Sequence, residues 1–206
     1  MGVISNGTTL LDAGALDSGV PTGAMTLIKT LTASSSATLD FLNGASSVVF
    51  DDTYKEYLFK FINIHPATDV RNLTFQVDTG TNTNYNIAVT SSLFRANQNE
   101  ADGGSAMSYR TGSDQAQGTA FQQISQASSN DNDSGVSGEL KIFSPSSGTF
   151  VKHFISTSNT AQATPDSQAT YCAGYFNTTT ALTRVRFKFA SGNIDSGVIK
   201  LYGIGG

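Results

Sequence analysis

The chain has 206 residues, 14% of them charged, and a formal net charge of −4. A chain of this length fits one domain, with a core large enough to fold without disulfides or a structural metal. The negative charge argues against a nucleic-acid partner, and no stretch has the roughly 18 apolar residues of a membrane-spanning helix, so no membrane partner is expected either.

Residues 1–24 differ from the rest of the chain in composition, and we interpret them as an extended N-terminal arm. Asn6-Gly7 is a pair that readily adopts the left-handed conformations of a tight turn, so a small hairpin is expected here. A flexible tail is the simpler interpretation. The alternative is an arm that orders against a neighbouring subunit, because it has too many apolar residues for a plain linker. The predicted assembly contacts are Val3, Ile4, Leu10 and Leu11.

From residue 25 onward, apolar and polar residues alternate as they do in β-strands. In LTFQV (73–77) every second residue is apolar, and Thr74 and Gln76 fall on the opposite, polar face. The run RVRFKFA (184–190) has the same period, with basic side chains between its apolar ones. Both runs predict strands that bury one face.

The stretch EYLFKFINI (56–64) is apolar on both faces apart from Lys60, which predicts a central strand covered on both sides. Clusters of Gly, Asn, Asp and Ser between the strands supply turns. This pattern predicts an all-β domain over residues 25–206, an antiparallel β-sandwich of the jelly-roll type, with a closed barrel as the alternative. Further strands are expected at 25–32, 36–42, 85–89, 136–143, 149–156, 171–176 and 198–204.

A long polar segment, residues 97–133, interrupts the strand pattern and is predicted to be an insertion. Its apolar residues favour one short amphipathic helix. Long insertions in compact β domains are usually functional or disordered, so we expect a contact surface here. The residues of the expected helix are Ala116, Ala120, Phe121 and Ile124.

The chain offers little for catalysis. His65 and His153 lie outside any recognisable nucleophile motif, and phosphate-binding loop motifs are absent. The acidic residues of the expected strands, Asp40, Glu56 and Glu139, are isolated from one another. We therefore expect a non-enzymatic protein without a cofactor.

The sequence likewise gives only weak indications of metal binding or redox chemistry. Asp131 and Asp133 could offer oxygen ligands to calcium, although plain solvation of a loop is the simpler interpretation. The single cysteine, Cys172, cannot form an intrachain disulfide and is expected to be a small buried side chain.

Carbohydrate binding is a further hypothesis, because flat aromatic rings match the apolar faces of sugars. The chain has no tryptophan, and most phenylalanines occupy expected core positions. Tyr85, Tyr109 and Tyr171 are the candidates for glycan contact, with packing at a sheet edge as the alternative.

Several stretches together are similar to a group of proteins of like length from tailed bacteriophages, many of them marine. They include SGNIDSGVIKLYGI, which resembles the closing hairpin of many phage tail-fibre and surface domains. The stretches are VISNGTTLLDAGAL (3–16), DDTYKEYLFKFINIHP (51–66), SSLFRANQNEA (91–101), IFSPSSGTFVKHFIS (142–156) and GYFNTTTALTRVRFKFASGNIDSGVIKLYGI (174–204).

This resemblance implies a structural protein of the virion and no catalytic residues. It leaves two roles open. An outer capsid decoration or cement protein would lie over the major capsid protein and clamp its neighbours with the arm, whereas a tail-fibre or adhesion protein would present loops to a host glycan. Either role implies a homo-oligomer, for which a trimer is expected. The arm and the absence of shaft repeats favour the first role.

Overall fold

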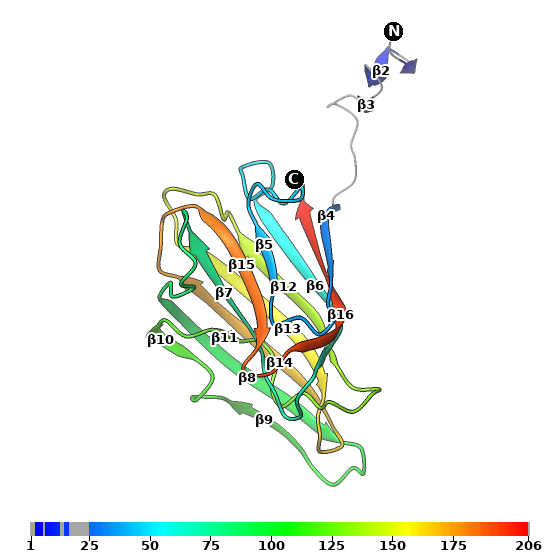
Figure 1. Cartoon of the computed structure of the whole chain (residues 1–206), viewed down its shortest axis with the longest axis vertical. Helices are drawn as coiled ribbons and strands as arrows, with labels where there is room; N and C mark the ends of the chain where they lie inside the picture. Colours follow the sequence, from blue (N-terminus) through cyan, green and yellow to red (C-terminus); the bar gives the residue numbers. More distant parts are fainter. Residues whose placement is uncertain (1–2, 6, 13–14, 17–24, 206) are drawn as a thin grey trace.

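A computed structural model describes residues 3–5, 7–12, 15–16 and 25–205 of the chain. The described residues form antiparallel strands and no helix, so the all-β prediction is confirmed (Figure 1). Near the N-terminus, three short strands pair in the order β1-β2-β3. They are β1 (Val3–Ser5), β2 (Thr8–Asp12) and β3 (Ala15–Leu16). Much of the predicted arm, including residues 17–24, lies outside the described residues, so its extended form stays a prediction.

The larger of the two main sheets has the strand order β10-β8-β14-β13-β12-β6-β16-β4, and β9 also pairs with β8. The smaller sheet has the order β11-β7-β15-β5. The larger sheet consists of β4 (Met25–Thr32), β6 (Glu56–Pro66), β8 (Val89–Asn99), β9 (Ser105–Tyr109), β10 (Gln115–Gly118), β12 (Val136–Phe143), β13 (Lys152–Ala161), β14 (Asp166–Phe176) and β16 (Ile194–Ile204). The smaller sheet consists of β5 (Leu39–Leu42), β7 (Leu73–Thr79), β11 (Gln122–Gln123) and β15 (Leu182–Phe189).

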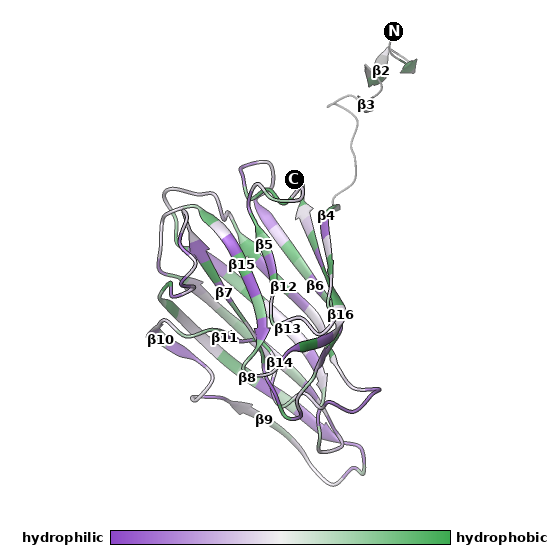
Figure 2. Ribbon diagram, viewed as in Figure 1, coloured by the Kyte–Doolittle hydropathy of each residue, from purple (hydrophilic) through white to green (hydrophobic). Residues whose placement is uncertain are grey.

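Aromatic side chains fill the space between these two sheets. The ring centroid of Phe187 on β15 lies 5.3 Å from that of Phe59 on β6. Phe75 on β7 lies 5.0 Å from Phe154 on β13 and 5.5 Å from Phe176 on β14. All five rings are buried, and Figure 2 shows hydrophobic and hydrophilic residues alternating along β15. Because each contact joins one sheet to the other, the two sheets face each other in sandwich-like layers.

The interior beside β8 and β14 is polar instead. Gln168 of β14 is fully buried, and its Oε1 accepts hydrogen bonds from Arg95 at 2.7 Å and from Gln162 at 2.8 Å. Gln122 of β11 is also buried and accepts a hydrogen bond from the hydroxyl of Ser91 at 2.6 Å. Burial of the Arg95 guanidinium lowers its pKa. Of these hydrogen bonds, the one between Gln122 and Ser91 attaches the segment 97–133 to strand β8.

The helix predicted within that segment is wrong. Gln115–Gly118 is strand β10 at the edge of the large sheet, and Gln122–Gln123 is strand β11 of the small sheet. Ile124 is fully buried, whereas Ala116 and Ala120 are exposed. Of the four residues of the predicted helix, only Ala116 lies in a strand, and the backbone N–H of Ile124 donates to Leu73 of β7 in the small sheet. The insertion also begins later than predicted, because residues 97–99 complete strand β8.

Loops cover the outer face of the small sheet, where the alternation of the sequence predicts a face open to solvent. Thr74 and Gln76 were expected on a polar outward face, but both are buried. The Gln76 side-chain amide donates to the backbone carbonyls of Ile87 at 3.1 Å and Ala120 at 3.2 Å. Residues 85–88, predicted to be part of a strand, belong to this covering loop.

Candidate functional site on the exposed face of the large sheet

Exposed apolar side chains gather on the outer face of the large sheet. Tyr109 of β9, Phe94 of β8 and Tyr171 of β14 lie directly opposite one another in the strand register, so their side chains share that face. The rings of Phe94 and Tyr171 are stacked, with centroids 4.9 Å apart and planes inclined by 11°. Phe94 is 41% exposed and Tyr171 is 39% exposed. These three side chains form an aromatic row with its flat faces in reach of solvent.

Charged side chains continue this row across the sheet. Opposite Tyr171 comes Thr157 of β13, followed by Glu139 of β12 and Lys60 of β6. The Lys60 ammonium lies 3.7 Å from the Glu139 carboxylate. In the neighbouring row Lys141 and Glu56 pair at 3.0 Å. Lys60 and Lys141 of this face are thus each paired with a glutamate, whereas Lys200, opposite Lys60 in the register, forms no ion pair with a described residue.

Three hollows lie along the same face. The first, of about 190 Å³, is lined by Phe94, Ile155 and Tyr171 among others. The second, of about 600 Å³, begins on the other side of Tyr171 and extends past Glu139 to Ile62. The third, of about 510 Å³, has a polar lining. Its lining residues are Asn63, His65, Asn132, Asp133, Ser134, Gly135, Ser137, Asn159, Ala161 and Ser196.

A bulge in β6 shapes the boundary between the second and third hollows. Asn63 has a φ of 48°, in the left-handed region, and its strand register shifts against both neighbours. A Cβ on Gly197, whose φ is 112°, would clash with the Asn63 carbonyl oxygen. The glycine therefore permits the close approach. The backbone N–H of Asn63 donates a hydrogen bond to the Ser137 hydroxyl at 3.1 Å. This hydrogen bond holds the polar corner between the second and third hollows.

His65 anchors the loop that contains Asp131, at the far end of the third hollow. Its Nε2 lies 3.0 Å from the Asp131 carbonyl oxygen. The Asp131 carboxylate accepts a hydrogen bond from Ser129 at 2.9 Å, whereas Asp133 lines the hollow. Within the described ranges, no group of three or more His, Cys, Asp and Glu side chains could hold a metal ion. The calcium hypothesis for Asp131 and Asp133 gains no support from this geometry.

The three candidate tyrosines lie in different environments. Tyr109 and Tyr171 lie on the exposed face, and the Tyr109 hydroxyl donates to Asp114 at 2.6 Å, a hydrogen bond that raises the pKa of Tyr109. Tyr85 is only 3% exposed, and the Arg186 guanidinium lies 4.0 Å from its ring centroid. Burial raises the pKa of Tyr85. Tyr85 was wrongly predicted as a glycan contact, because its ring has no free face.

Phe94 and Ile155 belong to the exposed face but were not selected from the sequence. A signal was present, because Leu93 and Phe94 are consecutive apolar residues and one of them must point outward from a strand. Leu93 is fully buried and Phe94 is exposed. The alternation in 152–161 likewise puts Phe154 inside and Ile155 outside.

The predicted assembly residues lie in the small N-terminal sheet. Val3 and Ile4 belong to β1 and are 53% and 65% exposed, and Leu11 of β2 is 37% exposed. Leu10 also lies in β2. β1 and β2 pair antiparallel, with Ser5 opposite Thr8, and Asn6 of the predicted turn lies outside the described residues.

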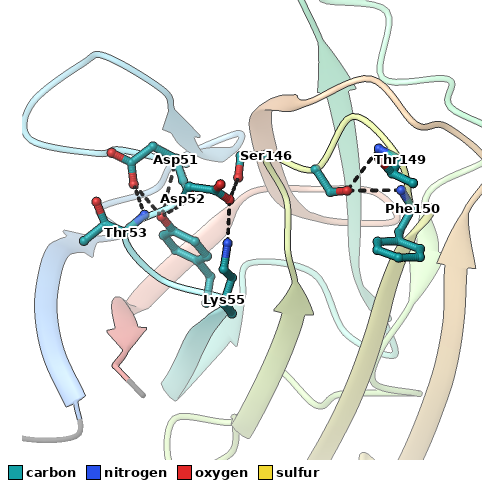
Figure 3. Close-up of polar contacts among 9 residues, drawn as sticks. Asp51, Asp52, Thr53, Lys55, Ser146, Thr149 and Phe150 are labelled. Carbon is teal, nitrogen blue, oxygen red and sulfur yellow. Dashed lines mark hydrogen bonds and ion pairs between the residues drawn. The ribbon is translucent and has the colours of Figure 1, made fainter.

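A further hollow, of about 320 Å³, lies where strand β4 begins. Leu27, Val49 and Tyr54 contribute to its lining, and Leu27 and Val49 are exposed. Hydrogen bonds hold the adjoining loops (Figure 3): the Asp52 carboxylate accepts from Lys55 at 2.8 Å and from Ser146 at 3.1 Å, which lowers the pKa of Asp52. This end of the sandwich therefore presents an ordered apolar depression beside an edge strand.

The remaining candidates have structural surroundings. Cys172 is buried, as predicted, and burial raises the pKa of its thiol to about 12. His153 is on the exposed face, 6.0 Å from the ring of Tyr175. The described part of the chain contains no helix able to cross a membrane.

In comparisons with known proteins, no family model, no curated protein and no solved structure matches the chain.

Proposed function

We propose that this chain is a non-enzymatic structural protein of a tailed-bacteriophage virion, an outer capsid decoration protein that contacts neighbouring subunits through its N-terminal arm. The observation that carries the proposal is the exposure of Val3, Ile4 and Leu11 in a sheet of very short strands. So small a sheet is marginally stable by itself in water and gains stability by burying its apolar residues on another surface. The resemblance of most of the chain to virion proteins supports the same role.

A surface suited to receive such an arm is present on the sandwich. Strand β4 is the last strand of the large sheet and, among the described residues, pairs only with β16. An edge strand can add a strand from another chain through backbone hydrogen bonds, and a nearby pocket can take its side chains. The hollow lined by Leu27, Val49 and Tyr54 lies beside β4. We propose that it receives the arm of a neighbouring copy in a trimer.

The strand pairing supports a jelly roll, the fold of many viral capsid domains. Eight strands in chain order form four nested pairs, β4 with β16, β5 with β15, β6 with β12 and β7 with β11. Within each sheet these pairs are joined side by side, because β16 also pairs with β6 and β15 also pairs with β7. In this jelly roll, β8–β10 and β13–β14 are insertions that widen one sheet.

Two measurements test the structural role. Mass spectrometry of purified virions is expected to find the chain, and its absence from the particle would end the proposal. Light scattering of the purified protein is expected to report a trimer, and removal of residues 1–24 to give a folded monomer. A trimer that survives this deletion would contradict the role of the arm.

Adhesion to a host glycan, as in a tail fibre, is a second candidate function. The exposed stack of Phe94 and Tyr171 favours it, because a solvent-facing aromatic ring can lie against the apolar face of a sugar. A glycan array distinguishes this candidate, since a decoration protein without an adhesive function is expected to bind no glycan.

A further inference from the structure

We infer that the three hollows on the exposed face form one groove that binds a linear oligosaccharide, with Tyr171 as its stacking platform. This inference rests on the second proposed function, adhesion to a glycan, and identifies its site and the class of its ligand. It requires no catalytic step.

The continuity of the groove follows from shared lining residues. Tyr171 and Thr157 line both the first and the second hollow. Ser137 and Asn159 line both the second and the third. The groove thus runs across the sheet from β8 to β16, which in the strand order spans five inter-strand spacings of about 4.8 Å, or roughly 24 Å. A groove of that length suits several linked sugar units better than one.

The aromatic end of the groove supplies contact with the apolar faces of sugar rings. Tyr171 is stacked on Phe94 with nearly parallel planes, so the orientation of its ring is fixed before a ligand arrives. A ring held in this way loses little conformational entropy on binding. Ile155 lines the first hollow and is 49% exposed, which extends the apolar surface along it.

The other end supplies hydrogen bonds. Asn63, Ser137 and Asn159 combine amide and hydroxyl groups that can both donate and accept, as sugar hydroxyls do. Between the two ends, Lys60 and Glu139 pair with each other rather than presenting one sign of charge. This combination matches a ligand that is neutral overall, has many hydroxyl groups and carries apolar C–H faces. An oligosaccharide has all three properties.

A second copy of the chain fits the groove less well. A stable interface between copies buries about 800 Å² on each partner around an apolar, closely packed centre. Here the centre of the face is concave and crossed by an ion pair, and its far end is polar. The occupant favoured by this chemistry is therefore the glycan.

The test is an array of neutral, N-acetylated and uronate-containing oligosaccharides, followed by calorimetry with graded lengths of the best binder. Affinity is expected to rise with ligand length until the groove is filled. Tyr171→Ala is expected to weaken binding roughly tenfold through loss of the stacking surface. Asn159→Ala is expected to weaken it by a smaller factor. Phe150→Ala is the matched control, because this ring is 68% exposed and lines none of the three hollows.

Each outcome bears on the inference, once circular dichroism has established that the variants are folded. Binding that survives both groove substitutions overturns the inference and leaves the adhesive function standing. Failure of every oligosaccharide to bind overturns both. If no glycan binds and Tyr171→Ala changes the oligomeric state, the face is an interface between copies and the inference is likewise overturned.

Discussion

The two outer faces of the sandwich differ in how their side chains are used. On the small sheet, Tyr85 and Phe121 fold back over Arg186 and Lys188, and the guanidinium and ammonium groups lie 4.0 Å and 4.3 Å from the two ring centroids. On the large sheet, the described residues include no such cover over Phe94 and Tyr171. Aromatic residues therefore stabilise the fold on one face and remain free to contact a ligand on the other.

The ion pairs on the two faces also differ. Arg186 forms a two-point contact with Asp40, with nitrogen–oxygen distances of 2.8 Å and 2.6 Å, and this hydrogen bonding raises the pKa of Arg186. The pair of Lys60 and Glu139 on the exposed face is longer, at 3.7 Å, and more open to solvent. The covered face should thus contribute more to folding than the exposed face does. This contrast can be tested by matched substitutions.

The largest expected difference is between two tyrosine truncations. Tyr85→Ala should lower the free energy of unfolding by about 3 kcal/mol, because it removes a buried ring and leaves a cavity. Tyr171→Ala should cost less than about 1 kcal/mol, since its ring is already in contact with solvent. Urea unfolding of both variants measures the difference. Equal losses would show that the exposed face is part of the stabilising core.

A smaller difference is expected for the two ion pairs. Asp40→Asn should cost about 1–2 kcal/mol, because Arg186 loses a charged two-point acceptor in a half-buried position. Glu139→Gln should change the stability by less than about 0.5 kcal/mol, as is usual for solvent-screened pairs. The same unfolding experiment, repeated at high salt, checks the ranking. The contrast between the faces fails if Glu139→Gln is the more damaging change.

The strands could largely be predicted from the sequence, whereas the covering of the faces could not. The alternation in 184–190 reports which side chains point to the core, because that depends only on the period of a strand. It does not report what lies over the opposite face. Thr74 and Gln76 alternate correctly with their apolar neighbours, yet both are buried, and the Gln76 amide donates to the carbonyl of Ala120, in a segment distant in sequence.

The candidate site could also be predicted only in part from the sequence. Tyr85 and Tyr171 look alike in sequence, each next to an apolar stretch, and only the loop containing Tyr85 turns back onto a sheet. Phe94 gains its significance from Tyr171, its cross-strand partner on β14, and strand register between distant segments cannot be read from one sequence. The helix expected at Ala116 and Phe121 failed because the segment is divided between strand β10 of one sheet and strand β11 of the other.

Alkaline pH provides a finer test of the covered face. Burial raises the pKa of Tyr85 above its ordinary value of 10.0, so the folded state keeps this proton at pH values where the unfolded state loses it. The stabilising contribution is complete below the unfolded pKa of about 10 and is lost as the pH rises through the raised pKa of the folded state, so the free energy of unfolding should fall from about pH 10 upward. Tyr85→Phe should make this decline shallower. At neutral pH the group is protonated in both states, so the comparison there serves as the control, and an unchanged alkaline slope would contradict the prediction.

The smallest expected effect lies at the edge of the exposed face. The Tyr109 hydroxyl donates to Asp114 at 2.6 Å and so ties β9 to the turn that follows it. Tyr109→Phe removes this hydrogen bond but keeps the ring, so global unfolding should be almost unchanged. Because edge strands open locally without global unfolding, the amides of β9 should exchange faster with deuterium while those of β14 stay as protected as before. If protection falls in β14 as well, β9 is an integral part of the sheet, and the exposed face contributes more to folding than its solvent exposure indicates.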